Sequence, residues 1–259
     1  MSTTYLMLRG NVKVADRHKT TGEPGAVTDV GEAPVFDIAV EVKFIENMNT
    51  SGAVSEKDLH VAGEQTGKVM ITVKEHTKEN LEMAVWGVTQ TTPETDVVAS
   101  PMQMGLEVGK EYFLPGRPLN VSDLSVEDST PVNPIDLVLG THYTANLTSG
   151  LIKILAFPVG VVQPIRASFT KGEVTDVGLL AKKSKPKFIF LEGINIADDD
   201  APIAVELFKG SFSPAKKIGL KGKEAVEYEY EVELLADTTK PRDAVLGRYG
   251  RIRTPTVPA

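Results

Sequence analysis

Two runs of alternating apolar and polar residues constrain the possible folds of this chain more than any other feature of its sequence. In the first run the even positions from Phe36 to Phe44 are all apolar, and most of the odd positions are charged. The second run, from Lys68 to Lys74, alternates in the same way around Val69, Ile71 and Val73. Because successive side chains of a strand point to opposite faces, each run predicts a strand with one apolar face. We expect the two strands to pair in an antiparallel sheet.

The residue period changes after Thr77, where a short helix is predicted. The apolar residues that recur at the spacing of one helical face are Leu81, Ala84, Val85 and Val88. Thr77 is suited to be the N-cap, and Gly87 stands where a helix is expected to stop. We expect Trp86 to pack into the core, with a subunit contact as the alternative.

The order of these segments resembles the N-terminal half of the major tail (tail tube) proteins of long, non-contractile-tailed bacteriophages. The resemblance rests on the strand Phe36–Phe44, a polar loop, the Lys57-Asp58 segment, a strand ending in Thr72-Val73, and the helix from Glu79-Asn80-Leu81 to Trp86-Gly87. Residues 5–14 are similar to the opening strand of that family. Farther along, residues 109–114, 146–154 and a Glu-rich final strand fit the expected positions.

This resemblance implies a fold, a function and a set of partners. The implied fold is mainly β, an antiparallel β-sandwich or partial barrel with one short flanking α-helix, and six copies close into a hexameric ring. Stacked rings form the hollow tail tube of the virion, which conducts DNA into the host. The implied partners are further copies of the chain, the tape-measure protein, and the tail terminator and tail-tip proteins. DNA passes through the lumen without specific binding, and subunits occupy the host cytoplasm during assembly.

Composition limits the alternatives. The formal charge of −7 over 259 residues disfavours a general phosphate-binding surface, which needs clustered Lys and Arg. No apolar run approaches the roughly 18 residues that span a bilayer, and residues 1–4 lack the start of a signal peptide, so we expect no membrane partner. The absence of cysteine excludes disulfides and thiol chemistry.

Turn residues and charge suggest the domain limits. We expect a single domain over residues 1–236, with long loops near 16–33, 46–58 and 89–108, where Gly, Pro and polar residues interrupt the strand patterns. Short strands separated by turns, without a helical period, are typical of an antiparallel sandwich or barrel. Residues 237–259, which contain several Arg and Pro, predict a flexible basic C-terminal extension.

One strand near the C-terminus has an unusual charge pattern. From Glu227 to Leu234, one face carries two Tyr, Val and Leu, and the other carries Glu227, Glu229, Glu231 and Glu233. Four like charges on one strand face repel one another, so they need water or basic cross-strand partners. The row is either a solvated outer face or, in a tube subunit, a lumen-facing lining that repels DNA.

Two shorter charged segments are also open to more than one interpretation. The basic cluster at residues 182–187 is either a solvated loop or an electrostatic contact with an acidic face of a neighbouring copy. The three aspartates at 198–200 lack the alternate spacing and the Glu of calcium loops, so we expect no metal there.

No catalytic constellation is visible in the sequence. The four histidines are far apart, and neither a nucleotide-binding glycine pattern nor a G-x-S-x-G motif occurs. We therefore expect a non-enzymatic protein without cofactor or metal.

The edge strands of an antiparallel sheet invite pairing with another chain, and ring closure removes such edges. The candidate inter-subunit or inter-ring loop residues are Asn47, Asn49, Ser51, Glu56, Lys57 and Asp58. Two alternatives remain: a tube component of a contractile injection or secretion system, and a monomeric β-sandwich that serves as a binding or decoration module.

Overall fold

The computed structural model describes residues 5–49, 56–223, 225–241 and 247–254. The described backbone is mainly antiparallel β-sheet with one short helix, as the sequence predicts. The chain divides into two compact units: unit 1 is Met1–Val88 with Val177–Ala259, and unit 2 is Thr89–Asp176. Each unit has its own hydrophobic core, so two units replace the single domain expected over residues 1–236.

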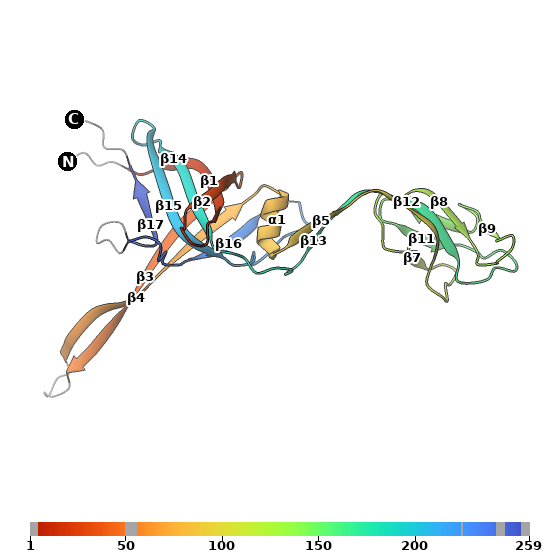
Figure 1. The fold of residues 1–259 in the computed structure, drawn as a ribbon, viewed down its shortest axis with the longest axis horizontal. Helices are drawn as coiled ribbons and strands as arrows, with labels where there is room; N and C mark the ends of the chain where they lie inside the picture. Colours follow the sequence, from red (N-terminus) through yellow and green to blue (C-terminus); the bar gives the residue numbers. More distant parts are fainter. Residues whose placement is uncertain (1–4, 50–55, 224, 242–246, 255–259) are drawn as a thin grey trace. The chain divides into compact units, whose positions relative to one another are not determined.

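Unit 1 is built on an eight-stranded antiparallel sheet (Figure 1). Its strands are β1 (Leu8–Arg17), β2 (Pro24–Asp29), β3 (Val35–Asn49), β4 (Glu56–Val73), β14 (Lys187–Asn195), β15 (Ala201–Phe212), β16 (Tyr228–Leu234) and β17 (Gly250–Arg253). The order across the sheet is β2-β1-β14-β15-β16-β4-β3, and β17 pairs with a separate part of β15. Within the described residues, β2 and β3 are therefore the two ends of this strand order, and β17 is a further edge strand beside β15.

The core of unit 1 lies between this sheet and helix α1 (Lys78–Val85). Ala84 and Val85 of the helix pack in one cluster with residues of the central strands, among them the fully buried Tyr228 and Tyr230. The Tyr230 hydroxyl donates to the Asn80 carbonyl of α1 at 2.8 Å, which ties the helix to β16. The alternation in the sequence of β16 thus predicts its buried face correctly.

The N-terminal end of α1 is as predicted from the sequence, and its C-terminal end differs from the prediction. Thr77 is the N-cap, and its hydroxyl accepts a hydrogen bond from the Asn80 backbone N–H at 3.1 Å. The left-handed residue at the C-terminus is Trp86 (φ 50°), whereas we expected Gly87. Gly87 is instead needed for packing, because a Cβ there would lie 2.7 Å from a methyl carbon of Val177. Val88, expected on the helical face, is exposed at the start of β5.

Unit 2 contains two small sheets that share a core. The first sheet has the order β10-β11-β7, from β10 (Tyr143–Asn146), β11 (Leu151–Ile154) and β7 (Glu111–Phe113). The second has the order β6-β12-β8-β9, from β6 (Thr95–Pro101), β12 (Arg166–Lys171), β8 (Ser122–Glu127) and β9 (Asp136–Leu137). Ile152 and Ile154 of the first sheet cluster with Val126 and Phe169 of the second. The two sheets and their shared core in unit 2 are compatible with the sandwich that was expected for the chain.

Asp128 organises the loops of unit 2. Its buried carboxylate accepts backbone hydrogen bonds from Thr130, Ile135 and Val162, and another from the Thr130 hydroxyl. Desolvation alone raises the pKa of this carboxyl, but the four hydrogen bonds outweigh it and lower the pKa to about 2. Asp128 therefore has a structural role inside unit 2.

Three segments expected to be irregular contain strands. The region 16–33 includes β2, paired with β1, and the region 89–108 includes β6 and most of β5 (Val88–Thr92), which pairs with β13 (Val174–Gly178). The extension from residue 237 includes β17, which pairs with β15. The expectation of a flexible extension is wrong for Gly250–Arg253, because its arginines find a buried acidic partner on β15.

Candidate assembly surfaces

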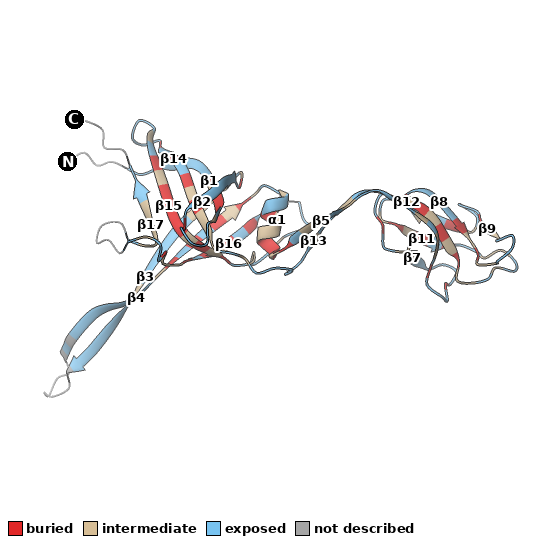
Figure 2. Cartoon of the chain, viewed as in Figure 1, coloured by how far each residue is buried: buried red, intermediate tan, exposed pale blue. Residues whose placement is uncertain are grey.

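The β3–β4 hairpin is longer than the sheet that supports it. β16 pairs with Gly67–Val73 of β4, so the preceding part of β4 has only β3 beside it among the described residues. We call residues 43–49 and 56–64 the arm. Figure 1 shows the arm extending beyond the rest of the sheet, and Figure 2 shows that its described residues are exposed. The region expected to be a polar loop at 46–58 is therefore largely strand.

One face of the arm is apolar and open to solvent. Ile45 lies opposite Val61, and Asn47 lies opposite Leu59. Ile45 is 60% exposed, Val61 49% and Leu59 43%. A two-stranded ribbon is marginally stable by itself in water, and a contiguous exposed apolar face commonly marks an interaction site. This face is the strongest candidate for a protein–protein contact in unit 1.

The opposite face of the arm is held together by polar and aromatic contacts. The rings of Phe44 and His60 stack with centroids 4.2 Å apart. The Glu46 carboxylate accepts a hydrogen bond from Lys57 Nζ at 2.6 Å and lies 3.0 Å from His60 Nδ1. The Lys57 hydrogen bond, together with that of His60, outweighs the opposing effect of desolvation and lowers the pKa of Glu46. These contacts fix the register of the ribbon outside the core.

The predicted loop residues fall on this arm or next to it. Asn47 and Lys57 lie on its two strands. The backbone of Asn49, Glu56 and Asp58 is also in β3 or β4, although their side chains are outside the described part of the structure. Ser51 lies outside the described residues. Ile45, Leu59 and Val61 were not among the predicted contact residues, although the alternation of Leu59 and Val61 is visible in the sequence.

The outer edge of β3 is a second candidate surface. This strand has 15 residues, and its other edge has no strand partner in the described part of the chain. The apolar face predicted for it is largely uncovered, since Val40 is 75% exposed and Phe44 is 50% exposed. Long edges with exposed apolar residues promote pairing with another chain. The shorter edge strand β2, which is exposed throughout, lies at the opposite side of the sheet.

The glutamate row is placed on the face of β16 that points away from the core. Its members are Glu227, which precedes the strand, and Glu229, Glu231 and Glu233. Glu231 is bound by two lysines, Lys216 Nζ at 2.7 Å and Lys68 Nζ at 3.1 Å, which lower its pKa. Glu227 lies 3.7 Å from Lys74. The basic partners that a row of like charges needs are therefore present for two of its members.

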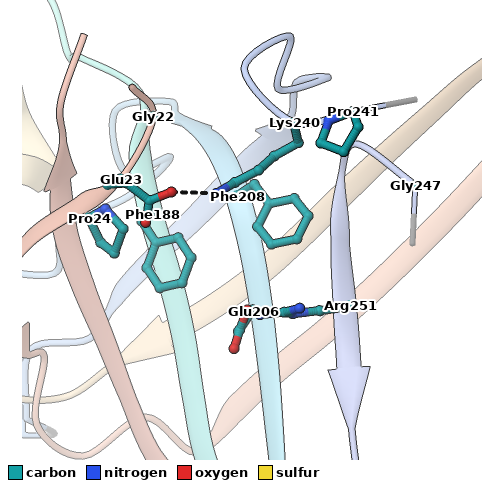
Figure 3. A pocket seen from close by; sticks show the side chains of 10 residues that line it. All are labelled: Gly22, Glu23, Pro24, Phe188, Glu206, Phe208, Lys240, Pro241, Gly247 and Arg251. Atoms are coloured by element: carbon teal, nitrogen blue, oxygen red, sulfur yellow. Dashed lines mark hydrogen bonds and ion pairs between the residues drawn. The ribbon is translucent and has the colours of Figure 1, made fainter. Parts of the chain in front are cut away.

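A pocket of about 300 Å³ lies where the C-terminal segment meets β15 (Figure 3). The nearly buried Glu206 carboxylate accepts hydrogen bonds from Arg251 at 2.7 Å and Arg253 at 2.9 Å. Desolvation raises the pKa of Glu206, but the two arginines outweigh it and lower the pKa overall. Arg251 and Lys240 also lie over the ring of Phe208, with 5.9 and 5.8 Å to its centroid.

This arrangement attaches strand β17 to β15. This attachment was not predicted, although Glu206 inside an apolar strand and two arginines spaced two residues apart were available signals in the sequence. Within the described residues, no group of three His, Asp or Glu side chains is placed to hold a metal ion. None of the helices in that part of the chain is long and apolar enough to cross a membrane.

Comparison with known families adds one result to this geometry. Residues 5–253 match the family described as "Protein of unknown function UCP028589". The chain belongs to this family. The match spans both units, so the insertion of unit 2 between the two parts of unit 1 lies within the matched region. No curated protein matches the sequence significantly.

Proposed function

We propose that this member of the UCP028589 family is a non-enzymatic structural subunit of a bacteriophage tail tube. Six copies close into a ring, and the rings stack into the conduit through which DNA enters the host. The observation that carries the proposal is the arm, a two-stranded extension with an exposed apolar face. A catalytic or ligand-binding protein does not need such an extension, whereas a subunit that must contact several copies of itself does.

The edges of the unit 1 sheet support closure into a ring. β3 and β2 lie at opposite sides of the sheet, so the two edges differ in length and in sequence. A contact between unlike edges is heterologous, and a heterologous contact repeated by rotation closes into a ring. Closure leaves no long edge exposed to unrelated chains.

We place the glutamate row of β16 on the lumen wall. A wall with an excess of carboxylates repels phosphate, so DNA slides along it without binding. Glu229 and Glu233 are the members we expect to contribute most, because Glu231 and Glu227 are partly neutralised by lysines. Replacing Glu229 and Glu233 with Gln should preserve assembly and slow DNA ejection. An unchanged ejection rate would mean that Glu229 and Glu233 do not line the lumen.

The arm is tested by placing a charge on its apolar face. We expect the wild-type chain to form rings or hollow tubes in negative-stain electron microscopy as its concentration rises. Ile45→Asp and Leu59→Asp should abolish these assemblies while the monomer stays folded, because both side chains are exposed. Ala62→Asp, at an exposed position on the opposite face of the same ribbon, is the matched control. Assembly that survives both apolar-face variants contradicts the proposal.

One observation favours a second candidate. Unit 2 has its own core and is inserted into unit 1 through β5 and β13, an arrangement suited to a displayed binding or decoration module. If this is its main role, the whole chain will remain monomeric at all concentrations, and deletion of unit 2 will remove its binding activity.

A further inference from the structure

We propose that the two ends of strand β14 form the stacking contact, in which the Asp198–Asp200 end of one copy docks against the Lys183–Lys185 end of the next. This inference rests on the proposed function and assigns the residues that hold successive rings together. β14 runs from Lys187 to Asn195 without interruption, so the segments before and after it lie roughly 27 Å apart.

The first end carries lysines that make no ion pair within the described residues, and it lies beside a groove. A groove of about 520 Å³ runs between α1, β1 and the segment that leads into β14. Lys182 pairs with Glu82 at 3.1 Å, and Lys187 pairs with Asp16 at 2.6 Å. Lys183 and Lys185 also line this groove, but neither makes an ion pair with any described residue.

The floor of the groove is partly apolar. Val14, Val30, Met83 and Trp86 contribute to its lining together with the lysine segment. Three carboxylates, those of Asp16, Glu79 and Glu82, also line this groove, so the lysines do not make it uniformly positive. The groove is therefore suited to an occupant with an apolar ridge and acidic flanks, and unsuited to a purely anionic ligand.

The second end provides such a ridge on another copy of the chain. Asp198, Asp199 and Asp200 form the exposed turn between β14 and β15 and make no ion pair within the described residues. Beside them, the N-terminal segment Tyr5–Met7 is held to the end of β14 by backbone hydrogen bonds with the Asn195 side chain.

This N-terminal segment is apolar and uncovered. Tyr5 is 73% exposed and Leu6 is 66% exposed, and both lie next to the acidic turn. The groove at one end and the ridge at the other carry opposite charges, and both have apolar residues. Because the two ends differ, their contact is heterologous and does not close by a two-fold axis, so it generates an open, directional stack.

Charge exchange tests the contact. The groove variant is Lys183→Glu with Lys185→Glu, and the turn variant is Asp198→Lys with Asp199→Asn and Asp200→Asn. Asn is used at 199 and 200 because both have positive φ, which Asn tolerates. The two sets change the net charge by equal and opposite amounts. Each alone should shorten tubes by about tenfold or more without preventing ring formation, and the combined chain should recover most of the length.

A matched control and a second measurement complete the test. Lys217→Glu with Lys221→Glu makes the same charge change at exposed positions elsewhere and should leave tube length unchanged. Because the natural chain has no cysteine, Lys185→Cys with Asp198→Cys should give a ladder of oligomers on oxidation, and each single variant should give dimers at most.

The outcomes separate the two proposals. Two results would overturn the stacking contact alone. In the first, the wild-type chain forms tubes and the groove variant forms tubes of the same length. In the second, the double-cysteine chain assembles but gives no ladder on oxidation. A wild-type chain that forms neither rings nor tubes would overturn the tube proposal and the contact that rests on it.

Discussion

The two halves of strand β4 have the same alternating pattern but very different surroundings. In the half that pairs with both β3 and β16, Val69, Ile71 and Val73 are at most 2% exposed. In the half that pairs with β3 alone, Leu59 and Val61 are more than 40% exposed. Alternation therefore predicts a strand with one apolar face, but that face is buried only where β4 packs with β16 and helix α1 in one core. A register shift after Val42 also places Leu59 and Val61 on the ribbon face opposite to that of Val69 and Ile71. Where this packing is missing, we infer that another copy takes its place.

The largest expected effect comes from truncating the buried half of the hairpin. Ile71→Ala should destabilise unit 1 by about 4 kcal/mol, because it leaves a cavity in a packed core. Denaturant unfolding followed by fluorescence of Trp86, the single tryptophan, measures this change. The matched variant Ile45→Ala on the arm should change stability by less than about 0.5 kcal/mol. Equal losses at the two positions would mean that the arm packs on unit 1 in the monomer.

The buried body of unit 1 and the exposed arm can also be compared through two ion pairs of equal length. The Arg17–Asp237 pair in the body of unit 1 and the Lys57–Glu46 pair on the arm both have N–O distances of 2.6 Å. The first is buried, with side chains 9% and 2% exposed. Arg17→Met should destabilise unit 1 by about 3 kcal/mol, because it leaves the Asp237 carboxylate buried without its cation.

The exposed pair provides the control. Lys57→Met should produce no measurable loss in the same unfolding experiment, because water screens an exposed pair. If Lys57→Met proves as destabilising as Arg17→Met, the arm is not the solvent-exposed extension described above.

A smaller and more local effect concerns β17, which shares strand β15 with β16. The folded-state pKa of Glu206 is lowered from the usual 4.5, so its contribution to stability is present above that pH. It is lost as the pH falls through the lowered pKa. The amide protection of residues 250–253, corrected for the slower intrinsic exchange in acid, should therefore fall as the pH drops below 4.5, before that of β16 is affected. Glu206→Gln should remove this pH dependence, and wild-type protection of residues 250–253 that does not change with pH would contradict the stabilising role of Glu206.

The local features of unit 1 could be predicted from the sequence, because they depend on neighbouring residues. Thr77 as N-cap and the buried face of β16 follow from side-chain chemistry and from the residue period. The long reach of β3 and β4 was missed because Asn, Ser and Gly near residue 50 favour loops, whereas cross-strand pairs such as Ile45 with Val61 extend the ribbon.

The division into two units could not be predicted, because it depends on contacts between distant residues. β1 pairs with β14, far away in sequence, and the short strands of unit 2 have the same local pattern as those of unit 1. The docking of β17 likewise depends on Glu206 meeting two arginines from another part of the chain. Periodicity identifies strands, but the partner of each strand is a property of the folded chain.

A three-dimensional electron cryomicroscopy reconstruction of the concentrated chain tests the central claim most directly. The account predicts stacked six-fold rings in which neighbouring copies cover the apolar face of the arm and the Glu229–Glu233 face of β16 lines a central channel. A monomeric particle, or an assembly in which Ile45, Leu59 and Val61 remain in solvent, would contradict it.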